Sequence, residues 1–169
     1  MKNGALLIAV VFLSESLRLA WLARFPAAPD FLLGIVVLVA LSRRPPAGAA
    51  VGLALGFFRD VLYGGFFGVE GLSLTLVGWG VGSLGKAIYR EAAVTQAVVI
   101  LGAGLLRGAL VYLLRTEADF AGLPGYVSVS AAPSAATTAI LVPLIYHFIP
   151  RGKPRPLSAH EKRKLLQQR

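Results

Sequence analysis

Residues 47–62 read Ala-Gly-Ala-Ala-Val-Gly-Leu-Ala-Leu-Gly-Phe-Phe-Arg-Asp-Val-Leu, an apolar run with a glycine at every fourth position and two charges near its end. Runs like this one are typical of membrane-spanning helices, which need about 20 residues to cross the hydrocarbon core. Further apolar runs recur along the 169 residues, of which 56% are hydrophobic and only 15% charged. The sequence therefore predicts an all-α integral membrane protein.

Hydropathy divides the chain into six candidate spans followed by a basic tail. We expect a six-helix transmembrane domain over residues 1–150 and a cytoplasmic tail over residues 151–169. Arg43 and Arg44 separate two short spans, which we interpret as separate crossings because a re-entrant hairpin would place both arginines in lipid. The apolar run after Lys2 has no small-residue cleavage site behind it, so we expect it to remain as the first helix. The spans are Gly4–Leu22, Ala27–Ser42, Ala47–Leu62, Gly68–Leu84, Ala92–Leu114 and Ala131–Ile149.

The cations indicate how the chain is oriented. With six spans both termini lie on one side, and twelve of the seventeen Lys and Arg residues share that side. The positive-inside rule then places both termini in the cytoplasm. The tail is expected to rest on anionic lipid headgroups or to dock a cytoplasmic partner. Its candidate contact residues are Arg151, Lys153, Arg155, Lys162, Arg163 and Lys164.

Glycines at four-residue spacing predict closely packed helices, because small residues let helix backbones approach one another in lipid. Two alternatives remain open at this point. The glycine faces pack within one bundle, or they face a helix of another subunit, in which case the protein is a homo-oligomer. The candidate packing residues are Gly48, Gly52, Gly56, Gly68, Gly78, Gly82, Gly104 and Gly108.

Six ionisable residues fall within the spans or at their ends, where charges are costly and usually functional. In the predicted topology all six lie in the outer half of the bilayer or at its outer rim. They form structural ion pairs, or they line an outward cavity or partner-binding cleft. Arg107 has the further alternative of extending to the interface. The six are Glu15, Arg18, Arg59, Asp60, Glu70 and Arg107, with Asp60 expected to pair with Arg18 or Arg107.

Other function classes find little support. The chain has no cysteine and two histidines, so a metal site is not expected, and neither is a cofactor. His147 lies near the predicted cytoplasmic end, far from any outward cleft, and no phosphate-binding loop or metalloprotease motif is present. The predicted protein is therefore not an enzyme. No folded basic domain supports nucleic-acid binding.

Within residues 29–84, a glycine-rich span contains Gly56 and Asp60, and a turn of small residues leads to Gly68 and Leu72. This stretch resembles the rod shape-determining protein MreD family, whose pattern is a glycine-rich span ending in Gly-x-x-x-Asp, a small-residue turn and then Leu-Gly-x-x-x-Leu. Gly56, Asp60, Gly68 and Leu72 occupy the motif positions. The resemblance implies a fold similar to the membrane-embedded substrate-binding subunits of vitamin transporters.

The resemblance also implies a non-enzymatic subunit of the cell-elongation machinery in the bacterial inner membrane, which supports peptidoglycan synthesis along the side wall. Its implied direct partner is an MreC-like single-span protein, with MreB filaments, RodA and its transpeptidase reached through that partner. Asp60 is expected to fix the outer ends of the third and fourth spans and to shape a cleft there. A small-solute-binding transporter subunit is the alternative, and it requires convergent polar groups in a pocket.

Overall fold

The computed structural model describes residues 13, 15, 16, 27–63, 66–84, 92–116 and 119–148. Regular structure in this part of the chain is helical throughout, as the sequence predicts. Most of the first predicted span and the whole basic tail lie outside the described residues. The helices are α2 (Phe31–Ser42), α3 (Pro45–Tyr63), α4 (Val69–Leu84), α5 (Ala93–Arg115), α6 (Leu123–Tyr126), the π-helix η2 (Val127–Ala131) and α7 (Ala132–Phe148).

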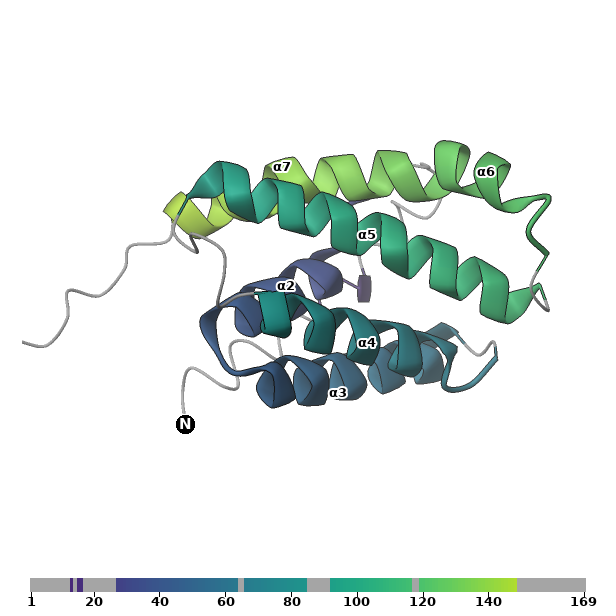
Figure 1. Ribbon diagram of the computed structural model, residues 1–169, viewed down its shortest axis with the longest axis horizontal. Helices are drawn as coiled ribbons and strands as arrows, with labels where there is room; N and C mark the ends of the chain where they lie inside the picture. Colours follow the sequence, from purple (N-terminus) through teal and green to yellow (C-terminus); the bar gives the residue numbers. More distant parts are fainter. Residues whose placement is uncertain are drawn as a thin grey trace, which may run out of the picture.

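The helices form two pairs around a central one. Figure 1 shows α3 beside α4 on one side of α2, and α5 beside α7 on the other side. Helix α2 contacts both pairs, and its side chains Leu32, Val36, Val37 and Ala40 are completely buried. A helix that is apolar all round belongs in the core of a bundle. This explains why α2 has no polar face.

Within the described part of the chain, two helical segments are long and apolar enough to cross a membrane. They are α5, with 23 residues, and the continuous helix Leu123–Phe148, with 26. Helix α2 has only 12 residues, so it is about 18 Å long against a hydrocarbon core of about 30 Å. The central helix is therefore too short to cross such a core by itself, and charged side chains lie beyond its first residue.

The last helix begins earlier than the sequence predicted. The predicted sixth span began at Ala131, but the chain is helical from Leu123 onward. Pro124 lies in the first turn, where its missing N–H needs no partner and its fixed φ favours a helix start. The π-helix η2 then joins this turn to α7 without a break.

Asp119 organises the turn before α6. Its carboxylate accepts hydrogen bonds from the Tyr112 hydroxyl at 2.9 Å and from the Ala121 N–H at 3.0 Å. The bond from Tyr112, together with backbone N–H groups, holds the pKa of Asp119 below its ordinary value. The carboxylate therefore stays ionised at neutral pH.

The glycines of α3 and α4 lie where the two backbones touch. A Cβ on Gly48 would meet the carbonyl oxygen of Gly78, and one on Gly52 would meet that of Leu74. A Cβ on Gly82 would lie 2.7 Å from the Cα of Pro45. These glycine contacts are therefore within one chain, and no side chain larger than hydrogen fits without moving a helix.

The remaining candidate glycines divide into two groups. Gly104 faces α7 and Gly108 faces η2, where added Cβ atoms would lie 2.7 Å and 2.5 Å from the Cβ atoms of Ala135 and Ala131. The prediction that Gly68 packs helices is wrong, because nothing lies within 4 Å of its Cβ position. Gly68 instead has a φ of 95°, a conformation that glycine adopts without strain, in the turn before α4.

Candidate functional site: a buried ion-pair network

The segment before α2 is tied to α7 by hydroxyl groups. The Ser134 hydroxyl donates to the carbonyl of Ala28 at 2.7 Å, and the Asp30 N–H donates to the Thr138 Oγ1 at 2.7 Å. The Asp30 carboxylate also accepts the N–H of Leu33 at 3.2 Å and thereby caps α2. These contacts fix Asp30 at the buried start of the central helix.

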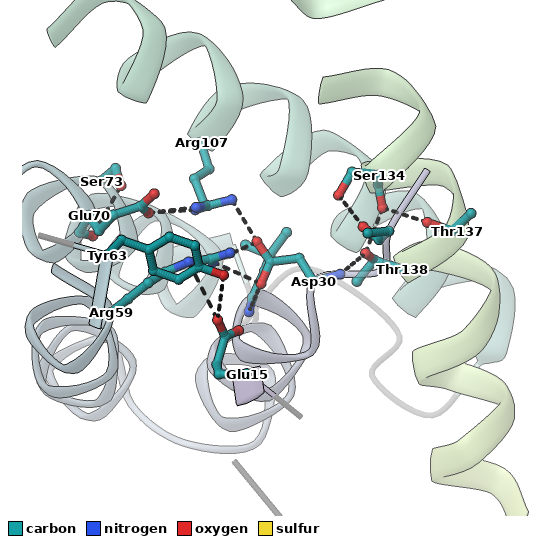
Figure 2. Close-up of polar contacts among 12 residues, drawn as sticks. Glu15, Asp30, Arg59, Tyr63, Glu70, Ser73, Arg107, Ser134, Thr137 and Thr138 are labelled. Atoms are coloured by element: carbon teal, nitrogen blue, oxygen red, sulfur yellow. Dashed lines mark hydrogen bonds and ion pairs between the residues drawn. The ribbon is translucent and has the colours of Figure 1, made fainter. Parts of the chain in front are cut away.

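Two arginines from opposite helix pairs share the Asp30 carboxylate (Figure 2). Arg59 of α3 donates from Nη1 to both carboxylate oxygens, at 3.1 Å and 2.9 Å. Arg107 of α5 donates from Nη1 to Oδ2 at 2.6 Å. One carboxylate therefore connects α2, α3 and α5.

Each arginine also reaches a second acid. Arg107 donates from Nε and Nη2 to Glu70 Oε2, at 3.1 Å and 2.5 Å. Arg59 Nε lies 3.9 Å from Glu15 Oε2, which also accepts the Tyr63 hydroxyl at 3.2 Å. Figure 2 shows both guanidinium groups pointing into the space between these acids. We call the set of Glu15, Asp30, Arg59, Glu70 and Arg107 the ion-pair network.

The network is nearly closed to solvent. Glu15 and Asp30 are 1% exposed, Arg59 is 3% and Glu70 is 5%. A buried ion is tolerated only when its partners satisfy it, and loss of one partner costs about 3–5 kcal/mol. Three acids face two arginines here, and Arg115 approaches Glu70 Oε1 at 3.8 Å from the rim. With Arg115 included, the formal charges of these described residues balance.

Asp60 plays a different part from the one expected of it. Its carboxylate accepts the backbone N–H groups of Gly68 at 3.0 Å, Glu70 at 3.1 Å and Gly71 at 3.0 Å. The expected pairing with Arg107 is wrong, because Arg107 binds Asp30 and Glu70. Asp60 lies near the end of α3 and caps α4, so it joins the adjoining ends of these two helices.

The structure therefore brings four of the six candidate charges into direct contact, and places Asp60 next to Arg59 on α3. Arg18 lies outside the described residues. Arg107 does not extend to the interface, because its side chain is only 12% exposed and bonds two buried acids. Arg43, Arg44 and His147 lie at the other ends of α2, α3 and α7. The described ionic groups of the helices thus separate by end.

Sequence reasoning missed Asp30, the centre of the network. The residue lies inside the range predicted for the second span, directly before a run of twelve helical residues. An aspartate in that position is a helix-cap signal, and within a membrane span it also counts as an ionisable residue. The hydroxyls of Ser134 and Thr138 were missed as well, because isolated Ser and Thr residues are common in spans.

A cavity of about 310 Å³ adjoins the network. Arg59, Glu70 and Arg107 lie on its wall, and Arg115, Tyr126 and Ser130 complete the lining on the side of α5, α6 and η2. Within the described residues no group of acids or histidines is arranged to hold a metal ion. The arrangement can bind a polar group, but it offers no activated nucleophile.

The chain can also be compared with known protein families. A family model described as rod shape-determining protein MreD matches residues 3–151, which include every described helix. The chain belongs to the MreD family. Neither curated proteins nor solved structures give a match. Family membership implies a role in rod shape determination, and the apolar helices agree with a membrane protein.

The MreD motif positions converge on the turn between α3 and α4. A Cβ on Gly56 would lie 2.5 Å from the Cα of Gly71, so Gly56 lets the helices meet just below the turn. Asp60 caps α4 through the N–H of Gly68, and the carbonyl of Gly68 accepts the N–H of Leu72 at 2.8 Å. The motif thus encodes one capped helical hairpin.

Proposed function

We propose that this chain is a non-enzymatic, multi-pass subunit of the bacterial cell-elongation complex. Its role is to bind an MreC-like single-span protein and to support peptidoglycan synthesis along the side wall. MreB filaments, RodA and its transpeptidase are connected through that partner. Membership of the MreD family carries this proposal, because the family match extends over residues 3–151.

The proposed topology has six spans with both termini in the cytoplasm. The separation of charges supports it, because Arg43 and Arg44 are exposed at the end opposite the network. Cations at one end satisfy the positive-inside rule, and the buried acids then lie toward the exterior. Large apolar side chains such as Trp79, Leu106 and Ile140 are exposed on three different helices, α4, α5 and α7, and suit contact with lipid.

The proposed partner site is the outer end of the α3–α4 hairpin together with the mouth of the cavity. Phe66 is 65% exposed and Phe67 is 69% exposed in the turn that precedes Glu70. Phe67 also stacks on Phe57, with ring centroids 5.6 Å apart, so the aromatic surface is held in place. Exposed aromatic side chains beside a polar depression match the composition of protein interfaces.

The test is co-purification of the tagged partner from membranes. The double variant Phe66→Ser, Phe67→Ser is expected to retain less than about a tenth of the partner, since central aromatic residues often contribute 2 kcal/mol or more to binding. Phe148→Ser is the matched control, because Phe148 is 79% exposed at the opposite end. Full partner recovery with the double variant would place the interface elsewhere.

A cell-shape assay tests the function itself. In rod-shaped bacteria depleted of their own MreD protein, this chain together with its MreC-like partner is expected to restore normal cell width. The double phenylalanine variant is expected to leave the cells rounded while the Phe148→Ser control restores the rods. Rounded cells with the unmodified pair would contradict the proposed role.

A further inference from the structure

The ion pair between Glu70 and Arg115, at the rim of the cavity, is too long to be a hydrogen bond. Arg107 holds Glu70 Oε2, whereas Oε1 has an ion pair only with Arg115 Nη2 among the described residues, at 3.8 Å. This distance is longer than the 2.7–3.2 Å of an N–H···O hydrogen bond. The Arg115 side chain is 42% exposed. The acceptor Glu70 Oε1 and the donor Arg115 Nη2 thus lie near each other, from two residues that line the cavity, without a hydrogen bond between them.

Two residues with hydroxyl groups line the same cavity as Glu70 and Arg115. Tyr126 of α6 and Ser130 of η2 line the cavity, and no hydrogen bond links either hydroxyl to another described residue. Ser134, one turn further on, donates instead to the carbonyl of Ala28. Tyr126 is held by stacking on Tyr112, with ring centroids 4.9 Å apart. Hydrogen-bonding side chains from four helices, α4, α5, α6 and η2, therefore line one cavity.

The charges restrict what can bind. The ion-pair network and Arg115 together carry three acids and three arginines, so a ligand with net charge would upset a balance held in a region of low dielectric. A simple anion at Arg115 would also lie close to Glu70 and be repelled by it. A group with a negative end toward Arg115 and a positive end toward Glu70 avoids both costs.

We propose that this cavity binds a small zwitterion with a carboxylate and an ammonium group, namely an amino acid or a dipeptide. The carboxylate accepts hydrogen bonds from Arg115, Tyr126 and Ser130, and the ammonium group donates to Glu70 Oε1. A volume of about 310 Å³ is at the small end of ligand pockets. This activity goes beyond partner binding, and it requires no transport.

The experiment is calorimetric titration of the purified full-length protein in lipid nanodiscs. The probes are L-alanine and alanyl-alanine, with propionate and ethylamine as analogues that each lack one charged group. We expect saturable binding of at least one zwitterion, and neither analogue is expected to bind. Arg115→Gln is expected to weaken binding about tenfold or more, because it removes a charge-assisted contact.

Two more variants secure the interpretation. Tyr126→Phe removes one hydroxyl and is expected to weaken binding about fivefold. Ser128→Ala is the matched control, since its hydroxyl bonds the carbonyl of Gly125 and does not line the cavity. Absence of binding by both zwitterions, equal binding of propionate, or unchanged affinity in both the Arg115 and Tyr126 variants would overturn the proposal. The titration needs no partner, so its failure leaves the proposed function standing.

Discussion

Replacing Asp60 by alanine removes the cap of α4 without touching either arginine of the network. The carboxylate is 4% exposed and accepts three backbone N–H groups at 3.0–3.1 Å. A hydrogen bond to a charged group contributes about 1.5–3 kcal/mol, and the three share one acceptor, so we expect Asp60→Ala to cost about 3–5 kcal/mol. At about 2–4 °C per kcal/mol for a chain of this size, the melting temperature falls by roughly 6–20 °C.

Thermal unfolding of the purified protein in detergent, followed by circular dichroism, measures this loss. Asp60→Asn keeps one carbonyl oxygen as an acceptor and is expected to show a smaller decrease. Asp119→Ala is the matched control, because Asp119 also accepts backbone N–H groups but is exposed to solvent. If Asp60→Ala melted at the wild-type temperature, or no lower than the Asp119 variant, the capping argument would be wrong.

Three further substitutions test the packing and the network by the same unfolding measurement. Asp30→Asn leaves two arginine contacts without an anion and is expected to cost about 3 kcal/mol or more; a wild-type melting temperature would show that the arginines find other partners. Gly52→Ala forces α3 from α4 and is expected to cost about 1–3 kcal/mol, whereas Gly80→Ala, with nothing within 4 Å, should not destabilise. Gly68→Ala strains a φ of 95° and is expected to cost about 1 kcal/mol; no loss would mean that the turn relaxes.

The sequence predicts the helices of the hairpin and the end at which the charges gather. Both features depend on local patterns, since the glycine spacing of α3 and the hydropathy of α4 are properties of single segments. The segregation of cations follows from a topology rule that needs no contacts. The start of the last helix was missed, because Gly122, Pro124 and Gly125 are as typical of turns as of a helix start.

The identity of the ion pairs could not be predicted in the same way. Asp30 and Arg107 are 77 residues apart and meet only because α2 is short and lies between two helix pairs. Asp60 was expected to bind an arginine, but backbone N–H groups of the next turn were nearer. Any of these acids is chemically able to pair with either arginine. The choice among them is made by the tertiary arrangement.

The shared carboxylate of Asp30 makes the two helix pairs mechanically dependent on each other. A rotation of α5 that withdrew Arg107 would leave Asp30 and Glu70 to compete for Arg59, so α3 would be displaced in turn. The hairpin bearing Phe66 and Phe67 would then move as well. A protein bound at the hairpin and a small molecule held beside Arg115 would consequently influence one another's affinity. The coupling would be reciprocal and would depend on the two carboxylate oxygens of Asp30, which bind both arginines.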